Sequence, residues 1–152
     1  MLAAGIATGR TSAAVLRLMV LGAALGAITV QDVREHRIPN RIVVPATIVC
    51  GALLLVDHVD LVALAPALVI VAALLVVSVV APTALGMGDV KLALLITVGL
   101  DGEGTAAIAT GFGLAAGYAV VLLARRGAAA RATALPLAPF LAGGALLVAS
   151  LP

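Results

Sequence analysis

Long apolar segments separated by short polar connections run along the whole chain. They cover residues 13–31, 42–56, 61–81, 90–100, 105–124 and 134–151, and the fourth could begin as early as Leu85. Roughly 20 apolar residues cross the hydrocarbon core of a bilayer, and these segments lack the alternation of a membrane β-strand. The pattern therefore predicts an all-α polytopic membrane protein, a bundle of about six transmembrane helices forming a single domain over residues 1–152.

The composition agrees with a protein dissolved in lipid. Hydrophobic residues make up 64% of the 152 residues and charged residues only 11%, more apolar than one soluble core requires. Small residues such as Gly111, Gly113 and Gly117 suit close helix approach in a membrane. Cys50 is the single cysteine, so neither an intrachain disulfide nor a cysteine cluster for zinc is available.

The charges between the apolar segments alternate in sign along the chain. If the basic connections are cytoplasmic, as the positive-inside rule requires, seven of the nine Lys and Arg residues lie inside and the N-terminus lies outside. Arg10 and Arg17 oppose this orientation, and a cleaved signal peptide over residues 1–31 is an alternative interpretation. The basic residues occupy short loops rather than one polar face, so we expect no nucleic-acid partner.

The first polar cluster covers residues 32–41, directly after the first apolar segment. Its arginines fit an ordinary cytoplasmic loop, and Asn40 is expected to cap the next helix. Asp32 is different, because it continues an apolar helix after Val30 and Gln31. An acid at such a position is usually functional or tightly paired, so Asp32 is a candidate catalytic residue.

The second cluster, Gly86-Met87-Gly88-Asp89-Val90-Lys91, opens the fourth apolar segment. Capping of a helix start would explain Asp89 alone. It does not explain Gly86 and Gly88, which remove side chains on either side of the acid and let an extended backbone approach it. Lys91 is the nearest charge, but residues two apart on a helix do not face each other.

Chain topology brings the two clusters together. From Asp32 the chain crosses the membrane, turns near residues 57–60 and returns, so both acids are expected at the same membrane face. Two carboxylates in a low-dielectric site tend to share one proton. The ionised acid can then take a proton from water while the protonated acid donates to a peptide carbonyl. The sequence thus predicts a water-activating pair, Asp32 and Asp89.

These residues resemble the type IV prepilin peptidases, bacterial members of the GxGD class of membrane aspartyl proteases. The likeness is carried by Asp32 with Arg34 and the Arg37-Ile38-Pro39-Asn40 segment, by residues 86–92, and by the final run 136–144. In that family the acids matching Asp32 and Asp89 are the catalytic pair. The resemblance implies that the surrounding motif positions shape the site and its access for substrate, namely Gly86, Gly88, Lys91, Arg34, Pro39 and Asn40.

The resemblance implies an aspartic-type endopeptidase in the bacterial cytoplasmic membrane, with its active site facing the cytoplasm. Its substrates would be prepilins or pseudopilins with class III leaders, short and basic, and membrane lipid is its other expected partner. Larger members add a cytoplasmic region with paired CxxC motifs and a methyltransferase activity. We expect instead a compact peptidase similar to those of Tad/Flp pilus systems, with no metal and no other cofactor.

Other functions and residues stay open at this point. A small membrane transporter or proton-relay protein would use membrane-embedded acids as relay sites. A structural subunit of a secretion machine, or an inactive family member, is a third interpretation. Glu35, Pro136 and Pro139 are further contributors to consider, although a solvated loop charge and a helix-shaping pair of prolines also explain them.

Overall fold

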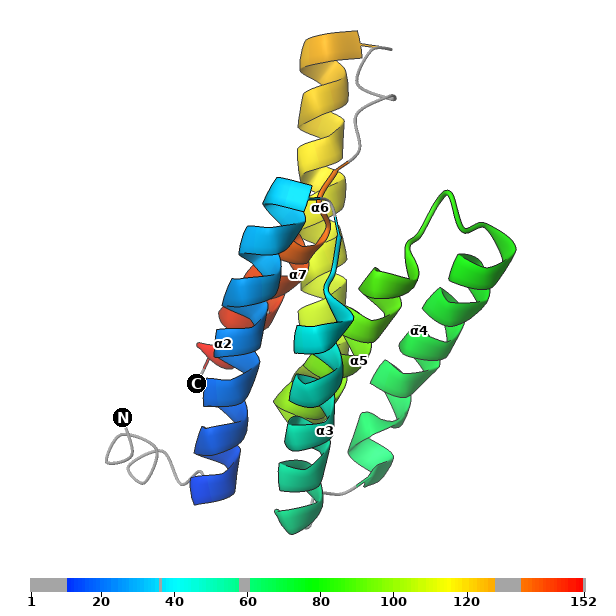
Figure 1. The fold of residues 1–152 in the computed structure, drawn as a ribbon. Coiled ribbons are helices and arrows are strands. Elements are labelled where there is room, and N and C mark those ends of the chain that lie inside the picture. Colours follow the sequence, from blue (N-terminus) through cyan, green and yellow to red (C-terminus); the bar gives the residue numbers. More distant parts are fainter. Residues whose placement is uncertain (1–10, 36, 58–60, 128–134, 152) are drawn as a thin grey trace.

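The computed structural model describes residues 11–35, 37–57, 61–127 and 135–151, and these residues contain helices and turns but no strand (Figure 1). The helices are α2 (Ser12–Glu35), α3 (Asn40–Val56), α4 (Leu61–Val80), α5 (Met87–Leu100), the 3-10 turn η1 (Asp101–Glu103), α6 (Gly104–Arg126) and α7 (Ala138–Ala149). The all-α class predicted from the apolar segments is confirmed. The helices begin and end within a few residues of those segments.

Helix length separates these elements into two groups. Three helical segments are long and apolar enough to cross a membrane, Ser12–Glu35, Val62–Val80 and the continuous stretch Met87–Arg126. Asn40–Val56 and Ala138–Ala149 are apolar but shorter. At 1.5 Å per residue, the 12 residues of α7 extend only about 18 Å, less than the hydrocarbon thickness of about 30 Å. The number of about six membrane-spanning helices therefore stays a prediction.

Helix α5 lies at the centre of the bundle and contacts α2, α3, α4, α6 and α7. Leu92, Leu95 and Ile96 on this helix are completely buried. By contrast, α4 leaves large apolar side chains such as Val69, Val76 and Val80 exposed on its outer face. A water-soluble monomer rarely exposes an apolar surface of this kind, so the outer face of α4 is suited to lipid.

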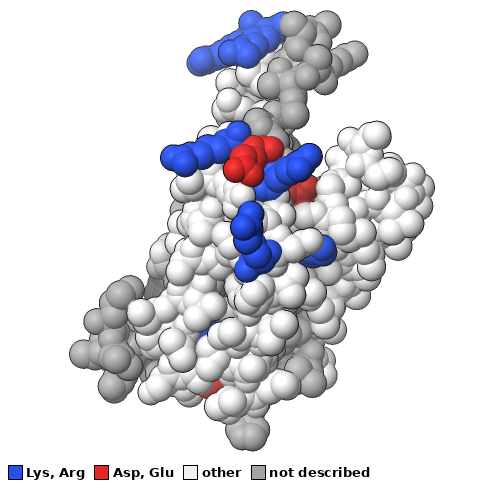
Figure 2. All heavy atoms as spheres, viewed as in Figure 1, with Lys and Arg blue, Asp and Glu red and all other residues white. Residues whose placement is uncertain are grey.

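Successive helices from α2 to α6 alternate in direction, so the connections gather at two ends of the bundle (Figure 1). One end holds the C-terminus of α2, the N-termini of α3 and α5, and the C-terminus of α4. Most of the Lys and Arg atoms visible in Figure 2 lie toward this end, including the tip of α6 that projects beyond the other helices. The bundle therefore has a strongly basic end.

Glycines allow α6 and α7 to pack with their backbones nearly in contact. A Cβ atom placed on Gly144 would lie 2.5 Å from the carbonyl oxygen of Ala107 and 2.5 Å from the amide nitrogen of Gly111. Gly111 is likewise closed off by the backbone of Leu141. This agrees with the small-residue packing predicted for Gly111. At Gly113 and Gly117 nothing lies within 4 Å, so these two glycines do not serve that contact.

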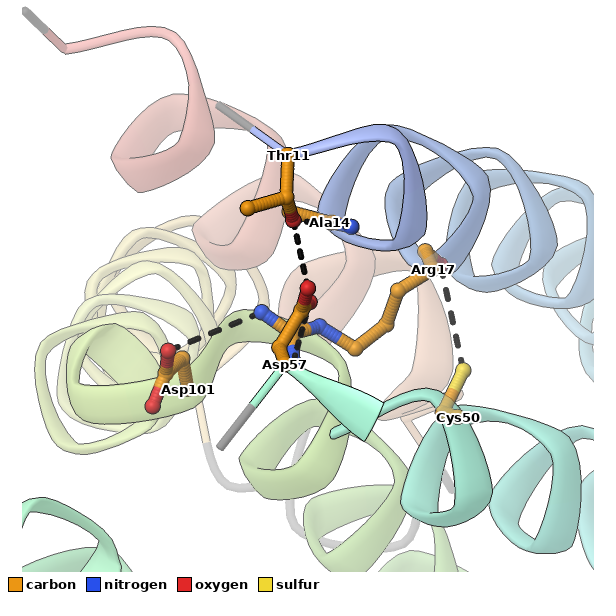
Figure 3. Close-up of polar contacts among 6 residues, drawn as sticks. All are labelled: Thr11, Ala14, Arg17, Cys50, Asp57 and Asp101. Atoms are coloured by element: carbon orange, nitrogen blue, oxygen red, sulfur yellow. Dashed lines mark hydrogen bonds and ion pairs between the residues drawn. The ribbon is translucent and has the colours of Figure 1, made fainter. Parts of the chain in front are cut away.

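The opposite end of the bundle is held by a buried arginine (Figure 3). Arg17, only 5% exposed, lies 3.6 Å from carboxylate oxygens of both Asp57 and Asp101. Thr11 also donates a hydrogen bond to Asp57. Arg17 is one of the two arginines that oppose the predicted orientation. Because it is paired with Asp57 and Asp101, its charge contributes little to the positive-inside balance.

Candidate active site

A cavity of about 530 Å³ opens at the basic end of the bundle, between the end of α2 and the starts of α5 and α7. Asp32 and Asp89, 57 positions apart in the chain, both line it. The two carboxylates are close enough to interact electrostatically. The other residues around the cavity are Arg37, Ile38, Thr83, Gly86, Gly88, Leu135, Pro136 and Leu137.

Asp32 is held by the backbone of α7. It lies in the last turns of α2 and is 6% exposed. Its Oδ2 atom accepts a buried hydrogen bond of 3.0 Å from the amide N–H of Ala138, the first residue of α7. A helix N-terminus carries unpaired N–H groups and a partial positive charge, so this position favours a carboxylate. The hydrogen bond therefore fixes one oxygen of Asp32 and leaves the other for the cavity.

Asp89 is the third residue of α5 rather than its cap. Gly86 is the N-cap residue, with an extended backbone and no side-chain hydrogen bond to the helix. The amide N–H of Asp89 donates to the carbonyl oxygen of Gly86 at 3.1 Å. Asp89 is thus not the N-cap residue of α5, although the backbone of Gly86 interacts with its carboxylate, and its side chain lines the cavity.

The two sequence motifs are joined by direct contacts at this end. Lys91 Nζ donates a hydrogen bond of 2.9 Å to Asn40 Oδ1. A Cβ atom on Gly88 would lie 2.9 Å from the Cβ atom of Ile38, so Gly88 lets α5 and the α2–α3 connection touch. These contacts hold the segment that follows Asp32 against the segment that contains Asp89.

One expectation from the sequence needs correction, and two others stay predictions. Asn40 does not cap α3, because Pro39 is the N-cap residue and forms no side-chain cap; Asn40 instead binds Lys91. Gly88 packs against Ile38 and, like Gly86, lines the cavity, and the nearest neighbour of a Cβ atom on Gly86 would be Asp89 Oδ2 at 3.4 Å; the role of both glycines in substrate access stays a prediction. Arg34 is exposed and lines a separate cavity with Gln31 and Glu35, and its role in shaping the site stays a prediction.

Sequence reasoning missed several residues that surround the acids. Arg37 belongs to a quoted motif but was interpreted only as a topology signal, whereas Thr83 carried no signal at all. Leu135 and Leu137 belong to the irregular segment before α7, where a helix-shaping role was expected for Pro136. Pro136 lines the cavity with them. The position of Ala138 beneath Asp32 is set by tertiary packing, which no local pattern reveals.

The described residues contain no group of three or more His, Cys, Asp and Glu side chains that could hold a metal ion. The expectation that the protein needs neither a metal nor another cofactor stays a prediction.

Together these features define a helical membrane protein with a polar cavity at one end of its bundle. A family model described as the type IV leader peptidase family matches residues 19–149, and the chain therefore belongs to that family. It is accordingly a protease of the prepilin leader peptidase type. Comparisons with curated proteins and with solved structures give no match.

Proposed function

We propose that this protein is an aspartic-type endopeptidase in which Asp32 and Asp89 together activate water. The observation that carries the proposal is that these acids, from two distant motifs, line one cavity. The cavity is large enough for an extended peptide segment, and Gly86 keeps it free of a side chain beside Asp89. Family membership supplies the reaction class, and the paired acids supply its chemistry.

The reaction follows from one proton shared between the two acids. The ionised carboxylate takes a proton from water as the water oxygen attacks the scissile carbonyl carbon, and the protonated acid donates to the carbonyl oxygen. The tetrahedral intermediate then collapses with cleavage of the C–N bond. The leaving amine takes the proton that came from water, and the second acid recovers its own proton from the intermediate. No covalent intermediate forms with the protein.

The substrates we propose are prepilins or pseudopilins with a short basic leader. Arg34, Arg37, Arg41, Lys91, Arg125 and Arg126 lie near the ends of helices at the basic end, which supports a cytoplasmic orientation of the cavity. A bacterial cytoplasmic-membrane location and substrates from Tad/Flp pilus systems are part of the same proposal and rest on the resemblance. Arg37 borders the cavity and brings a positive charge to it.

The transporter or proton-relay interpretation receives less support. Within the described residues, the buried polar or charged side chains are Arg17, Asp32, Ser78 and Thr97. Arg17 lies at the opposite end from Asp32, and the helix between them buries the apolar residues Leu21, Leu25 and Ile28. A relay needs polar groups spaced closely enough to pass a proton.

Single substitutions test the proposal directly. Asp32→Asn and Asp89→Asn should each abolish cleavage of a co-expressed prepilin, because each removes one half of the acid–base pair while keeping its size. Both variants should accumulate in membranes at the parental level. Asp57→Asn, which changes an acid at the opposite end, is the matched control and should leave cleavage intact. Cleavage at the parental rate by either dyad variant would refute the assigned chemistry.

A further inference from the structure

The two acids of the cavity stand in unequal surroundings. Asp32 Oδ2 accepts a buried hydrogen bond from the N–H of Ala138 on a different helix, whereas the backbone that interacts with the Asp89 carboxylate is that of Gly86, at the start of its own helix. A buried backbone donor that points at a carboxyl oxygen stabilises the ionised acid, and a helix N-terminus adds to this effect. The surroundings therefore distinguish two groups that are chemically identical.

We propose that the N-terminus of α7 assigns the roles within the pair, with Asp32 as the carboxylate base and Asp89 as the proton-bearing acid. The inference deepens the proposed function and rests on it. Ala138 is a positioning residue in this scheme, since it acts through Asp32 and not on the substrate. The shared proton sits on Asp89 before water attacks, and Asp32 receives the proton released by water.

Several features keep the bond between α7 and Asp32 in place. Ala138 is 1% exposed, and Pro139 follows at a helix position where its missing N–H costs no helical bond. The close contact of Gly144 with the backbone of α6 fixes the axial position of α7. Among the described residues, no hydrogen bond reaches Asp32 Oδ1. That oxygen is therefore free to bind the attacking water.

Other charged groups near the pair do not supply an equivalent interaction. Helix α7 has no titratable side chain of its own. On α5, Lys91 is bound to Asn40 and does not line the cavity. On the α2–α3 connection, Arg37 borders the cavity, and among the described residues it forms no ion pair with either acid. Arg34, Glu35 and Arg41 are exposed. Within the described residues, the Ala138 N–H is thus the donor from another helix that reaches Asp32 and not Asp89.

Deleting this one N–H tests the inference. Lactic acid in place of Ala138 converts the amide to an ester, which keeps the side chain and removes only the donor. Ala138→Pro is a weaker test, because Leu137 has a helical backbone that a following proline disfavours. The matched control is phenyllactic acid in place of Phe140, whose N–H donates to the carbonyl oxygen of Leu137 in the same helical turn.

The readout is kcat and KM for a synthetic leader peptide, measured against pH in detergent. The ester at 138 should lower kcat about tenfold or more, leave KM unchanged and move the acidic limb of the pH–rate profile to higher pH. The ester at 140 should leave the profile in place. A parental profile for the 138 ester, or the same shift from the 140 ester, overturns the role assignment while leaving the protease intact. Failure of the folded parent protein to cleave any leader peptide overturns the proposed function itself.

Discussion

Lys91 Nζ donates a 2.9 Å hydrogen bond to Asn40 Oδ1, joining the two motifs that carry Asp32 and Asp89. The residues are 51 positions apart, so the bond reports on tertiary structure and not on either helix alone. It lies beside the cavity but outside its lining. We interpret it as a brace that keeps the spacing of the two acids.

The brace can be tested with a double-mutant cycle. Asn40→Leu and Lys91→Met should each lower the cleavage rate by about two- to fivefold, since one partly exposed hydrogen bond is lost. The double variant should be no slower than either single variant, because both remove the same interaction. Fully additive losses in rate would show that the two side chains act separately.

Gly88 should tolerate substitution poorly. In Gly88→Ala the new methyl group would lie 2.9 Å from Ile38 Cβ, so α5 and the α2–α3 connection must separate. We expect a loss of about 1–3 kcal/mol in the free energy of unfolding and a slower cleavage rate. Gly113→Ala, where nothing lies within 4 Å, is the control and should be neutral or stabilising. Equal behaviour of the two variants in thermal unfolding would contradict the contact.

Two adjacent glycines of α7 should respond in opposite directions. Gly144→Ala places a methyl group 2.5 Å from backbone atoms of α6 and should destabilise the bundle by about 1–3 kcal/mol. Gly143→Ala meets only the Leu114 side chain, at 3.6 Å, and should gain about 0.5–1 kcal/mol from helix propensity. Unfolding of both variants in one detergent provides the measurement, and a stable Gly144→Ala protein would argue against the close approach of α6 and α7.

Arg17 should matter for stability but not for chemistry. Arg17→Met leaves the Asp57 carboxylate buried without a counter-ion, with Thr11 as its remaining hydrogen-bond donor, which we expect to cost about 3–5 kcal/mol. Adding Asp57→Asn should recover part of this loss, because the uncompensated charge is removed as well. Cleavage per folded molecule should stay at the parental value in both variants. Loss of cleavage without a change in the free energy of unfolding would contradict this prediction, because it would mean that Arg17 influences the cavity at the opposite end of the bundle.

The sequence was sufficient for the helices and for placing the two acids at one end of the bundle, because both depend on local or topological signals. Apolar segments between charges defined helices such as α4 and α6 closely, and the antiparallel path placed Asp32 and Asp89 at one end.

The sequence could not supply the contacts between distant helices. Asn40 is compatible with a helix cap by residue type, but Lys91 competes for its side chain. Gly88 was expected to give substrate access, but its contact with Ile38 had no signal in the sequence. The donor of Ala138 is a backbone atom, which has no signature in any residue pattern.

The burial of Arg17 in α2 has a consequence for biosynthesis. Asp57 and Asp101 lie downstream of Arg17, so the ribosome completes α2 before either counter-ion has been made. Until those acids emerge, the guanidinium must remain hydrated at the membrane surface or inside the translocation machinery. Helix α2 is therefore synthesised before the two residues that compensate the charge of its buried arginine.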